Sequence, residues 1–342
     1  MQPGLQQVFE ELLEWCHARD FAGYDPFDAL NSQLFQATPL KNSRTFRLAW
    51  TQLLKHAPLN LRPLVSVPVQ RNAKGIALFA LAALANHRRS QSQQSVVTAR
   101  GLLDDLLRMK LTSSTGTAWG YNFDWQSRVF FAPRGTPTIV PTAFAVRALV
   151  EAAQIFGDDH FLRTARSACD FILHDLKRSV DTDAELCFSY STHTKTRIYN
   201  ASLLAAETLA SVSSLTNEAE LCEMAIRAAR YVTNRQREDG AWTYGEESTQ
   251  AWVDNFHTAF VLSSLTRIMD CAGTDEFQQS LMRGFEFWRT RFFLADGSPK
   301  YYDDSPYPFD IHSAATAIAT LVDLNELDPQ ALPLAERVAR WS

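Results

Sequence analysis

Two hydrophobic patterns alternate along this chain of 342 residues. The first is a run rich in Ala, Leu and Ser, with helical spacing and almost no charge. It recurs five times at intervals of about 55 to 66 residues, from Gly75, Pro141, Asn200, His257 and His312. A helix that is apolar on nearly all sides is a buried helix. The pattern therefore predicts five buried helices at regular intervals.

The second pattern is amphipathic, with Arg, Glu and Asp on one side of a helical period and Leu, Ala and Phe on the other. It is typical of helices that face solvent. We predict such helices over 97–109, 160–176, 219–235 and 277–293, and further helices over 5–19, 43–56 and 332–341. Alternation with a period near 57 residues predicts an all-α fold, an (α/α)6 toroid of six helical hairpins with inner and outer helix rings. No linker interrupts it, so residues 1–342 are predicted to form a single domain.

Composition narrows the class of partner. Hydrophobic residues make up 46% and charged residues 21%, as in ordinary globular proteins. The net charge of −5 argues against nucleic acid as a partner. Five cysteines without a CxxC pair favour a reducing compartment. The N-terminus does not resemble a signal peptide, and no uninterrupted apolar run reaches about 18 residues, so we predict no transmembrane segment and a cytoplasmic location.

The connections that lead into the buried helices are long and carry most of the polar and aromatic motifs. In a toroid, connections of one class lie on the same face, which favours a binding site there. Aromatic rings with polar tips can stack on sugar rings while amides and carboxylates bind hydroxyl groups. Many of these side chains are equally able to brace loops or the core. The candidates for substrate binding are Trp119, Tyr121, Asn122, Trp125, Tyr190, Tyr199, Asn200, Asp239, Trp242, Tyr244 and Tyr302.

Two short motifs place an acid and a histidine at the start of consecutive buried helices. These are Asp254 with His257, and Asp310 with His312. Each Asp is a good helix N-cap, which is its structural interpretation. Each His can donate or accept a proton or be a buried structural residue. Because the repeats are adjacent, we expect the two histidines to face each other across the mouth, with Tyr301 as a third catalytic candidate.

Further candidates lie in the first half of the chain. Asp124 is a possible catalytic acid, and Arg128 can bind a carboxylate in bidentate fashion, although a loop salt bridge explains it equally well. Lys74 precedes the first buried helix and can hold an acidic substrate. The sequence contains no HExxH, no Gly-rich phosphate loop, no GxSxG and no zinc-type Cys/His spacing. We therefore predict neither a metal nor a cofactor.

Two segments resemble toroidal enzymes of isoprenoid chemistry. QREDGAWTYG, residues 236–245, resembles the QW repeat of squalene and terpene cyclases. DNFHTAFVLSSL, residues 254–265, is similar to the helix of protein prenyltransferase β subunits that carries a zinc-binding His, which would make His257 a zinc ligand. The cyclase motif occurs clearly once, without a DxDD motif, and the Asp-x-Cys partner of the zinc site is missing. We interpret both as shared architecture.

Over most of its length the chain resembles a poorly characterised group of bacterial proteins from exopolysaccharide and capsule gene clusters. The matching segments include GYDPFDALNS, GYNFDWQSR, IYNASLLAAE, WVDNFHTAF and PKYYDDSPYPFDIHSA. This resemblance implies a role in polysaccharide biosynthesis. It also implies the six-hairpin fold used by glycosidases, uronate lyases and glucuronyl epimerases.

Four functions remain open at this point. The first is epimerase or lyase chemistry on a uronate-containing glycan or its lipid-linked precursor, with Tyr and His moving a proton and Arg128 or Lys74 neutralising the carboxylate. The second is glycoside hydrolysis, which needs two carboxylates from Asp124, Asp239, Asp254 and Asp310. The third is a non-catalytic scaffold that binds glycan or a glycosyltransferase, and the fourth is isoprenoid cyclisation. The expected partner is a carbohydrate, and the oligomeric state stays open.

Overall fold

The structure is a computed structural model that describes residues 3–127 and 130–342. It is mainly helical and divides into two compact units. The N-terminal unit is Gln6–Phe171, and the C-terminal unit is Ile172–Ser342 together with residues 3–5. We describe each unit separately.

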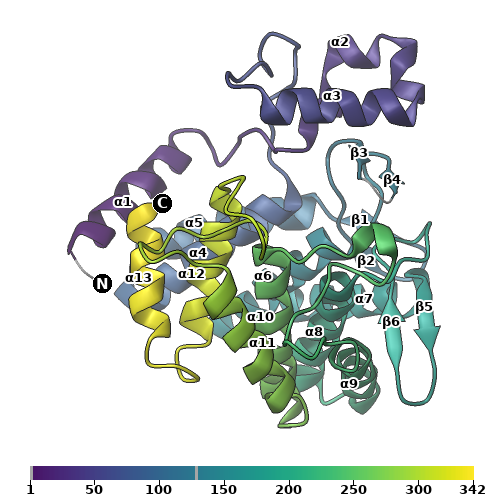
Figure 1. Ribbon diagram of the computed structural model, residues 1–342, viewed down its shortest axis with the longest axis vertical. Coiled ribbons are helices and arrows are strands. Elements are labelled where there is room, and N and C mark those ends of the chain that lie inside the picture. The colour runs from purple at the N-terminus through teal and green to yellow at the C-terminus, as the bar shows by residue number, and fades with distance from the viewer. Residues whose placement is uncertain (1–2, 128–129) are drawn as a thin grey trace. The chain divides into compact units, whose positions relative to one another are not determined.

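The N-terminal unit is built around two helical hairpins, in which α4 packs against α5 and α6 against α7 (Figure 1). The two buried helices of these hairpins, α4 and α6, also pack against each other. Short ribbons of antiparallel strands lie in the connection between α5 and α6. The elements are α1 (Pro3–His17), η1 (Asp28–Asn31), α2 (Gln33–Gln36), η2 (Pro39–Asn42), α3 (Arg44–His56), α4 (Ala73–Ser90), α5 (Gln93–Arg108), β1 (Leu111–Thr112), β2 (Thr117–Ala118), β3 (Trp125–Gln126), β4 (Phe131–Ala132), α6 (Ile139–Phe156) and α7 (Asp159–Asp170).

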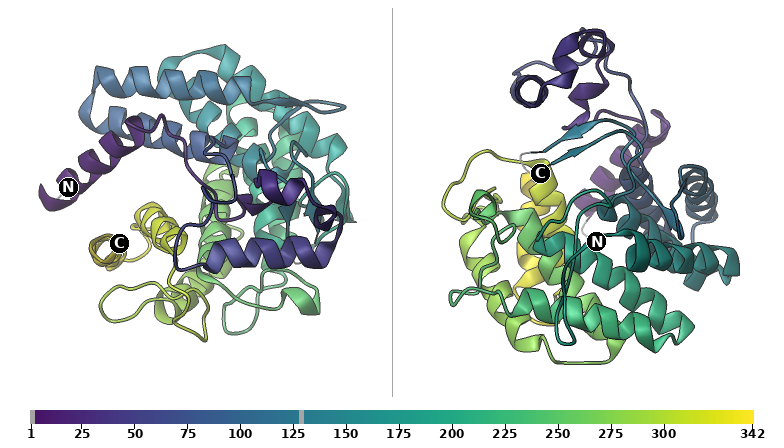
Figure 2. Two further views of the ribbon diagram at one scale, coloured as in Figure 1. Left: turned by 90° about the horizontal axis from the view of Figure 1, so that it is seen from above. Right: turned by 90° about the vertical axis from the view of Figure 1, so that its right-hand side faces the viewer.

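The C-terminal unit contains three hairpins, α8 with α9, α10 with α11 and α12 with α13 (Figures 1 and 2). Within it, α8 packs against α10 and α10 against α12, so the first helices of the three hairpins are neighbours. The elements are a π-helical turn (Phe171–Asp175), β5 (Arg178–Asp181), β6 (Leu186–Phe188), α8 (Tyr199–Thr216), α9 (Ala219–Thr233), η4 (Ser248–Gln250), α10 (Asn255–Ala272), α11 (Gln278–Arg291), α12 (Ile311–Asp323) and α13 (Ala331–Trp341).

The predicted repeat is confirmed in detail by the buried helices. Each of α4, α6, α8 and α10 is 18 residues long. Each ends on a residue in the left-handed conformation whose N–H bonds back into the last turn, namely Gln91, Gly157, Asn217 or Gly273, with φ between 53° and 64°. This is a common way to satisfy the free carbonyls at a helix end. In the hairpins α4–α5, α6–α7 and α8–α9, two residues then connect the buried helix to its outer helix, whereas α10 and α11 are joined by five.

Three sequence-based expectations need comment. The helix predicted over 160–176 ends as an α-helix at Asp170 and continues as the π-helical turn. All five cysteines are free in the structure. Helix α6 is long and apolar enough by length and composition alone to cross a membrane, although 61% of it is buried. Buried core helices pass the same test, and the absence of a transmembrane segment stays a prediction.

Candidate functional site

The start of α10, in the C-terminal unit, holds the best-organised group of polar side chains. Asp254 is the N-cap, and its Oδ1 accepts a hydrogen bond of 2.9 Å from the backbone N–H of His257. The Thr258 hydroxyl donates to the Asp254 carbonyl at 2.7 Å. The prediction that Asp254 caps this helix is therefore confirmed. Capping uses only Oδ1 of the carboxylate, so Oδ2 can accept further hydrogen bonds.

The second oxygen of Asp254 orients the imidazole of His257. Oδ2 lies 2.6 Å from Nδ1 of His257 and also accepts a 2.8 Å hydrogen bond from the indole N–H of Trp252. The Asp254 side chain is 1% exposed and that of His257 is 23% exposed. Because a carboxylate only accepts, Nδ1 carries the proton in this pair. The other ring nitrogen, Nε2, is thereby the basic one and can accept a proton from a ligand.

A continuous row of rings, here called the aromatic shelf, surrounds this pair. It consists of Trp252, Tyr244, His257, Phe256 and His312. Tyr244 and Trp252 stack with ring centroids 4.6 Å apart, and Tyr244 lies 4.5 Å from the His257 ring. Phe256 contacts both imidazoles, at 4.1 Å from His257 and 4.6 Å from His312. The two histidines therefore lie on one surface with the Phe256 ring in contact with both.

The connection between α11 and α12 is attached to the same place through its backbone. The N–H of Asn255 donates to the carbonyl of Tyr301 at 2.9 Å, and its side-chain amide donates to the carbonyl of Lys300 at 3.0 Å. Asp254 and Tyr302 form an isolated β-bridge. The Tyr301 ring lies 5.8 Å from Phe256. The structure thus brings Tyr301, Tyr302, His257, His312 and Asp254 together.

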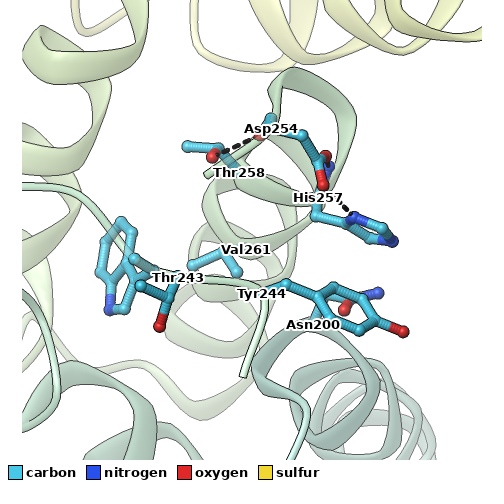
Figure 3. Close-up of a pocket in the computed structure, with 8 residues that line it drawn as sticks. Asn200, Thr243, Tyr244, Asp254, His257, Thr258 and Val261 are labelled. Carbon is cyan, nitrogen blue, oxygen red and sulfur yellow. Dashed lines mark hydrogen bonds and ion pairs between the residues drawn. The ribbon is translucent and has the colours of Figure 1, made fainter. Parts of the chain in front are cut away.

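A small cavity lies beside the Asp254–His257 pair (Figure 3). Its volume of about 10 Å³ suits roughly one water molecule or one hydroxyl group. Asn200, at the start of α8, lines the cavity together with Tyr244 and His257. The side-chain oxygen of Asn200 is buried and has no hydrogen-bond partner within the described part of the chain. A buried acceptor without a partner is costly, so this position favours a polar donor from a ligand or solvent.

Two further acidic residues, Asp303 and Asp310, lie in the connection that leads to α12. Burial raises the pKa of the Asp303 carboxyl, and the nearby charge of Asp304 adds to this. The backbone N–H of Asp303 donates to the carbonyl of Val253, next to Asp254. Asp310 caps α12 by accepting from the N–H of His312 at 3.1 Å. Its predicted capping role is also confirmed.

The loop that carries Tyr244 and Trp252 is held by a charged network centred on Glu246. Burial by itself raises the pKa of Glu246, but hydrogen bonds from Tyr231, Arg197 and Arg235 outweigh it and hold that pKa below the ordinary value. The Tyr231 hydroxyl is 2.5 Å and an Arg197 guanidinium nitrogen 2.7 Å from the carboxylate. Burial raises the pKa of Tyr199 to about 12. An open pocket of about 320 Å³, lined partly by Arg197, Glu246 and Lys195, lies beside this network.

Several predicted sugar-binding residues of the C-terminal unit serve its interior instead. Trp242 is buried and donates its indole N–H to the carbonyl of Val232. Tyr190 and Tyr199 are also buried, and Tyr199 lies against Tyr231. Asp239 is exposed and forms a salt bridge with Arg237. These placements match the structural alternative for each side chain.

The remaining candidates belong to the N-terminal unit. Trp119 is 0% exposed and donates to the carbonyl of Leu106, so its side chain offers no surface to a ligand. Tyr121 and Trp125 contact each other at 5.4 Å, and Asp124 accepts from the N–H of Arg134. The side-chain amide of Asn122 donates to the side-chain oxygen of Gln70 and to the backbone carbonyl of Arg71. Arg128 lies outside the described residues.

Among the described cations of the N-terminal unit, Lys74 has the most strongly shifted pKa. Burial lowers its pKa to about 8, and the neighbouring Asp25 carboxylate partly opposes this. Its ammonium nitrogen lies 4.9 Å from the centroid of the Phe144 ring. Lys74 is therefore a partly buried cation at the start of α4, where a helix N-terminus disfavours positive charge.

Within residues 3–127 and 130–342, no group of three His, Cys, Asp or Glu side chains is placed to hold a metal ion. His257 bonds to Asp254 and contacts aromatic rings, which suits proton transfer better than metal binding. Sequence reasoning missed Trp252 and Phe256, which complete the shelf. The segment WVDNFH contained the signal, because Trp252 precedes the N-cap by two residues and Phe256 lies between the cap and His257.

No family model and no curated protein matches the chain. Solved structures do resemble it. A cellobiose 2-epimerase from Bacillus thermoamylovorans has 12% sequence identity and a TM-score of 0.63, over 81% of this chain and 78% of that one. A D-mannose isomerase has 13% identity and a TM-score of 0.60, over 80% and 75% of the two chains. An inactive variant of an α-1,6-mannanase from Salegentibacter, solved with α-1,6-mannotriose, has 10% identity and a TM-score of 0.54, over 94% and 90%.

At this level of identity the likeness shows the fold. The chain has the six-hairpin, (α/α)6 toroid fold that is shared by these epimerases, isomerases and mannanases, which confirms the predicted fold class. The solved relatives act on or bind carbohydrates, as their names state. The proposed membership of an exopolysaccharide group stays a prediction.

Proposed function

We propose that this protein is a carbohydrate-active enzyme that moves a proton at a sugar carbon beside a carbonyl or carboxylate group. The observation that carries the proposal is the Asp254–His257 pair. A buried carboxylate fixes Nδ1 of a partly exposed imidazole, which is how proteins prepare a histidine as a general base. The likeness in fold to sugar epimerases and a sugar isomerase supports this class of reaction.

In the proposed reaction, Nε2 of His257 removes the proton from the sugar carbon. The electron pair of the broken C–H bond forms a double bond to the neighbouring carbonyl carbon, and the π pair of the carbonyl group moves onto its oxygen to give an enolate. His312, beside Phe256 on the same surface, then delivers a proton to the other face of this carbon once the planar enolate has turned that face toward the shelf, which inverts its configuration. Asn200 and Tyr244 bind hydroxyl groups of the substrate, and the shelf rings contact its C–H faces.

The substrate is either a reducing sugar, which reacts beside its open-chain aldehyde, or a uronate within a polysaccharide precursor, which reacts beside its carboxylate. We favour the uronate and a role in polysaccharide biosynthesis, as the sequence resemblance implies, and a cytoplasmic location, as the cysteine pattern favours. A uronate needs a cation near its carboxylate. Lys74 and Arg128 stay sequence-based predictions for that role.

Glycoside hydrolysis is the second candidate, and one observation favours it. Burial raises the pKa of Asp303, which stands beside Asp304 in the chain, and a glycosidase needs a carboxyl with a raised pKa as its general acid together with a second carboxyl group. Asp254 is unsuited to this reaction because both its oxygens are occupied by His257 and Trp252. Asp303 and Asp304 are therefore further hydrolytic candidates, beside Asp124, Asp239 and Asp310 from the sequence.

The test is incubation of the purified protein in heavy water with two sets of sugars, reducing disaccharides and uronate-containing oligosaccharides, followed by NMR and mass spectrometry. The proposal predicts deuterium at the carbon beside the carbonyl or carboxylate, without chain cleavage. His257→Gln should abolish the exchange. An unsaturated product would indicate a lyase, and cleavage with addition of water would indicate a hydrolase. Sugars that remain unchanged in both sets would contradict the proposal for these substrates.

A further inference from the structure

Charge is distributed very unevenly along the chain. Residues 29–103 contain ten Lys and Arg and no Asp or Glu. The rest of the chain contains 23 Lys and Arg against 38 Asp and Glu. The net charge of −5 therefore combines a long basic stretch with an acidic remainder. The basic stretch lies wholly within the N-terminal unit and contains α2, α3 and α4.

Helix α3 in this stretch has two different faces. Its inner face, with Leu54 and Trp50, packs against a small cluster that includes Ala29 and Val67. Its outer face carries Phe46 and Leu53, two turns apart, which are 50% and 54% exposed. An amphipathic helix normally turns polar residues outward. Large apolar side chains on the outward face are therefore unexplained by the packing of this unit.

The exposed apolar surface continues on both sides of α3. Leu59 and Leu64, in the Pro-rich segment after the helix, are 74% and 75% exposed. Before the helix, Leu34 and Leu40 are also exposed. We call the exposed side chains of this region the α3 face: Leu34, Leu40, Phe46, Leu53, Leu59 and Leu64. Single exposed apolar residues are ordinary on protein surfaces, but a group within about 31 residues of sequence indicates an interaction site.

Cations border the same face. Lys41 and Arg47 hydrogen-bond to uncharged acceptors, the carbonyl of Gln36 and the side-chain oxygen of Gln126. Arg44 is exposed and lies with Arg47 in the first turn of α3. Positive charge in a first turn opposes the helix dipole, so these cations do not serve the helix itself. By contrast, Arg62 and Arg71 are neutralised by Asp28 and Asp105.

We propose that the α3 face binds the surface of an anionic lipid bilayer. Exposed Leu and Phe enter the boundary between headgroups and acyl chains, while bordering Lys and Arg attract anionic headgroups. Because residues 29–103 contain no Asp or Glu, this stretch has no carboxylate that an anionic surface would repel. A nucleic acid would use the cations but would leave the exposed leucines in water. The proposal is independent of the reaction assigned to the Asp254–His257 site.

Vesicle binding by the full chain tests the proposal. Vesicles of phosphatidylcholine alone are compared with vesicles containing phosphatidylglycerol, at low and high salt, by flotation. We expect binding to the anionic vesicles, weakening with salt, and little binding to the neutral ones. Phe46→Ser with Leu53→Ser should weaken partitioning roughly tenfold or more, because two apolar side chains no longer enter the bilayer. Leu59→Ser with Leu64→Ser should do the same and does not alter a helix.

The matched control is Val322→Ser with Leu332→Ser, which removes two similarly exposed apolar side chains from the C-terminal unit. It should bind vesicles like the unaltered protein, and circular dichroism should show all variants folded. Failure of the unaltered protein to float with anionic vesicles would overturn the proposal. Equal losses in the control and in the α3-face variants would also overturn it. A dimer in light scattering that Phe46→Ser with Leu53→Ser dissociates, without vesicle binding, would assign the face to a second copy of the chain.

Discussion

The starts of α10 and α12 carry nearly the same residues but form different structures. At both, an Asp caps the helix and accepts from the backbone N–H of a following His, at 2.9 Å in α10 and 3.1 Å in α12. At α10 the same carboxylate also binds the His257 ring and the Trp252 indole and is almost fully buried. Asp310 is only partly buried, and the residue after it, Ile311, is largely exposed.

Spacing explains this difference. His257 follows its Asp by three residues, and His312 follows its Asp by two. On a helix, side chains three apart share a face, whereas side chains two apart do not. The His257 ring can therefore fold back onto the Asp254 cap, whereas the His312 ring lies against Phe256 and Phe260. One motif makes an oriented base and the other makes a second imidazole on the same shelf.

The largest expected effect follows from breaking the α10 pair. His257→Gln removes the base, and Asp254→Asn can donate to Nδ1 instead of accepting from it, which moves the ring proton to Nε2. Each change should lower turnover about 10²- to 10⁴-fold. Because the two residues act as a unit, the double variant should be scarcely worse than either single one. Deuterium exchange rates measure all three.

Asp158→Asn is the matched control for loss of a capping carboxylate. Asp158 also caps a helix and accepts from the N–H of a following His, His160, but on the outer helix α7. Asn caps helices as well as Asp does, so this variant should keep full activity. If Asp158→Asn lowered turnover as much as Asp254→Asn, the orienting role of Asp254 would be refuted.

His312→Gln should separate proton exchange from inversion. In the proposed reaction His257 removes the proton and His312 returns one to the other face of the enolate after it has turned on the shelf. The variant should still exchange the proton with solvent but should invert the carbon at least about tenfold more slowly. NMR reports both rates in one sample. Parallel loss of exchange and inversion would remove His312 from the second step.

Trp252→Phe should have a smaller effect on the α10 pair. It keeps a stacked ring beside Tyr244 but deletes the hydrogen bond to Asp254. Loss of one hydrogen bond to a charged group that orients the base predicts a roughly tenfold fall in turnover with little change in KM. If turnover stayed unchanged and KM rose instead, Trp252 would act by contacting the substrate and not by orienting Asp254.

Glu246→Gln should affect stability more than activity. Because the pKa of Glu246 is held below its ordinary value in the folded state, its charge stabilises the fold above the unfolded-state pKa. That contribution is lost as pH falls through the folded-state pKa. At neutral pH the variant should lose about 1–2 kcal/mol of unfolding free energy. In acid its stability should depend less on pH than that of the unaltered protein, and urea unfolding across pH 3 to 7 measures this.

The fold could be predicted from the sequence because helical periodicity is a local property. The five runs of Ala, Leu and Ser predicted the starts of the buried helices within two residues, whereas the equal 18-residue lengths of α4, α6, α8 and α10 were not predicted. The strand ribbons were not predicted, because strands of two to four residues leave almost no periodic signal. Their pairing depends on the loops that contain them.

The candidate site could be predicted only in part. Asp254, His257, His312 and Tyr301 come together because helix starts and one long connection meet in the C-terminal unit. The exposure of the aromatic side chains could not be predicted. Trp119 and Trp242 lie in polar, aromatic segments typical of binding loops, but both side chains are buried in the interior. The basic stretch was overlooked because a whole-chain charge of −5 averages it with acidic residues elsewhere.

The most direct measurement of the central claim is the tautomer of His257. The chain has eight histidines, so ¹⁵N-labelled His gives few NMR signals, and His257→Gln identifies the one that matters. At a pH of about 8.5, where imidazole is neutral, we predict that Nδ1 carries the proton and Nε2 does not. Asp254→Asn should reverse or mix the two forms. A proton on Nε2 in the unaltered protein would contradict the account, because no basic nitrogen would then face the substrate.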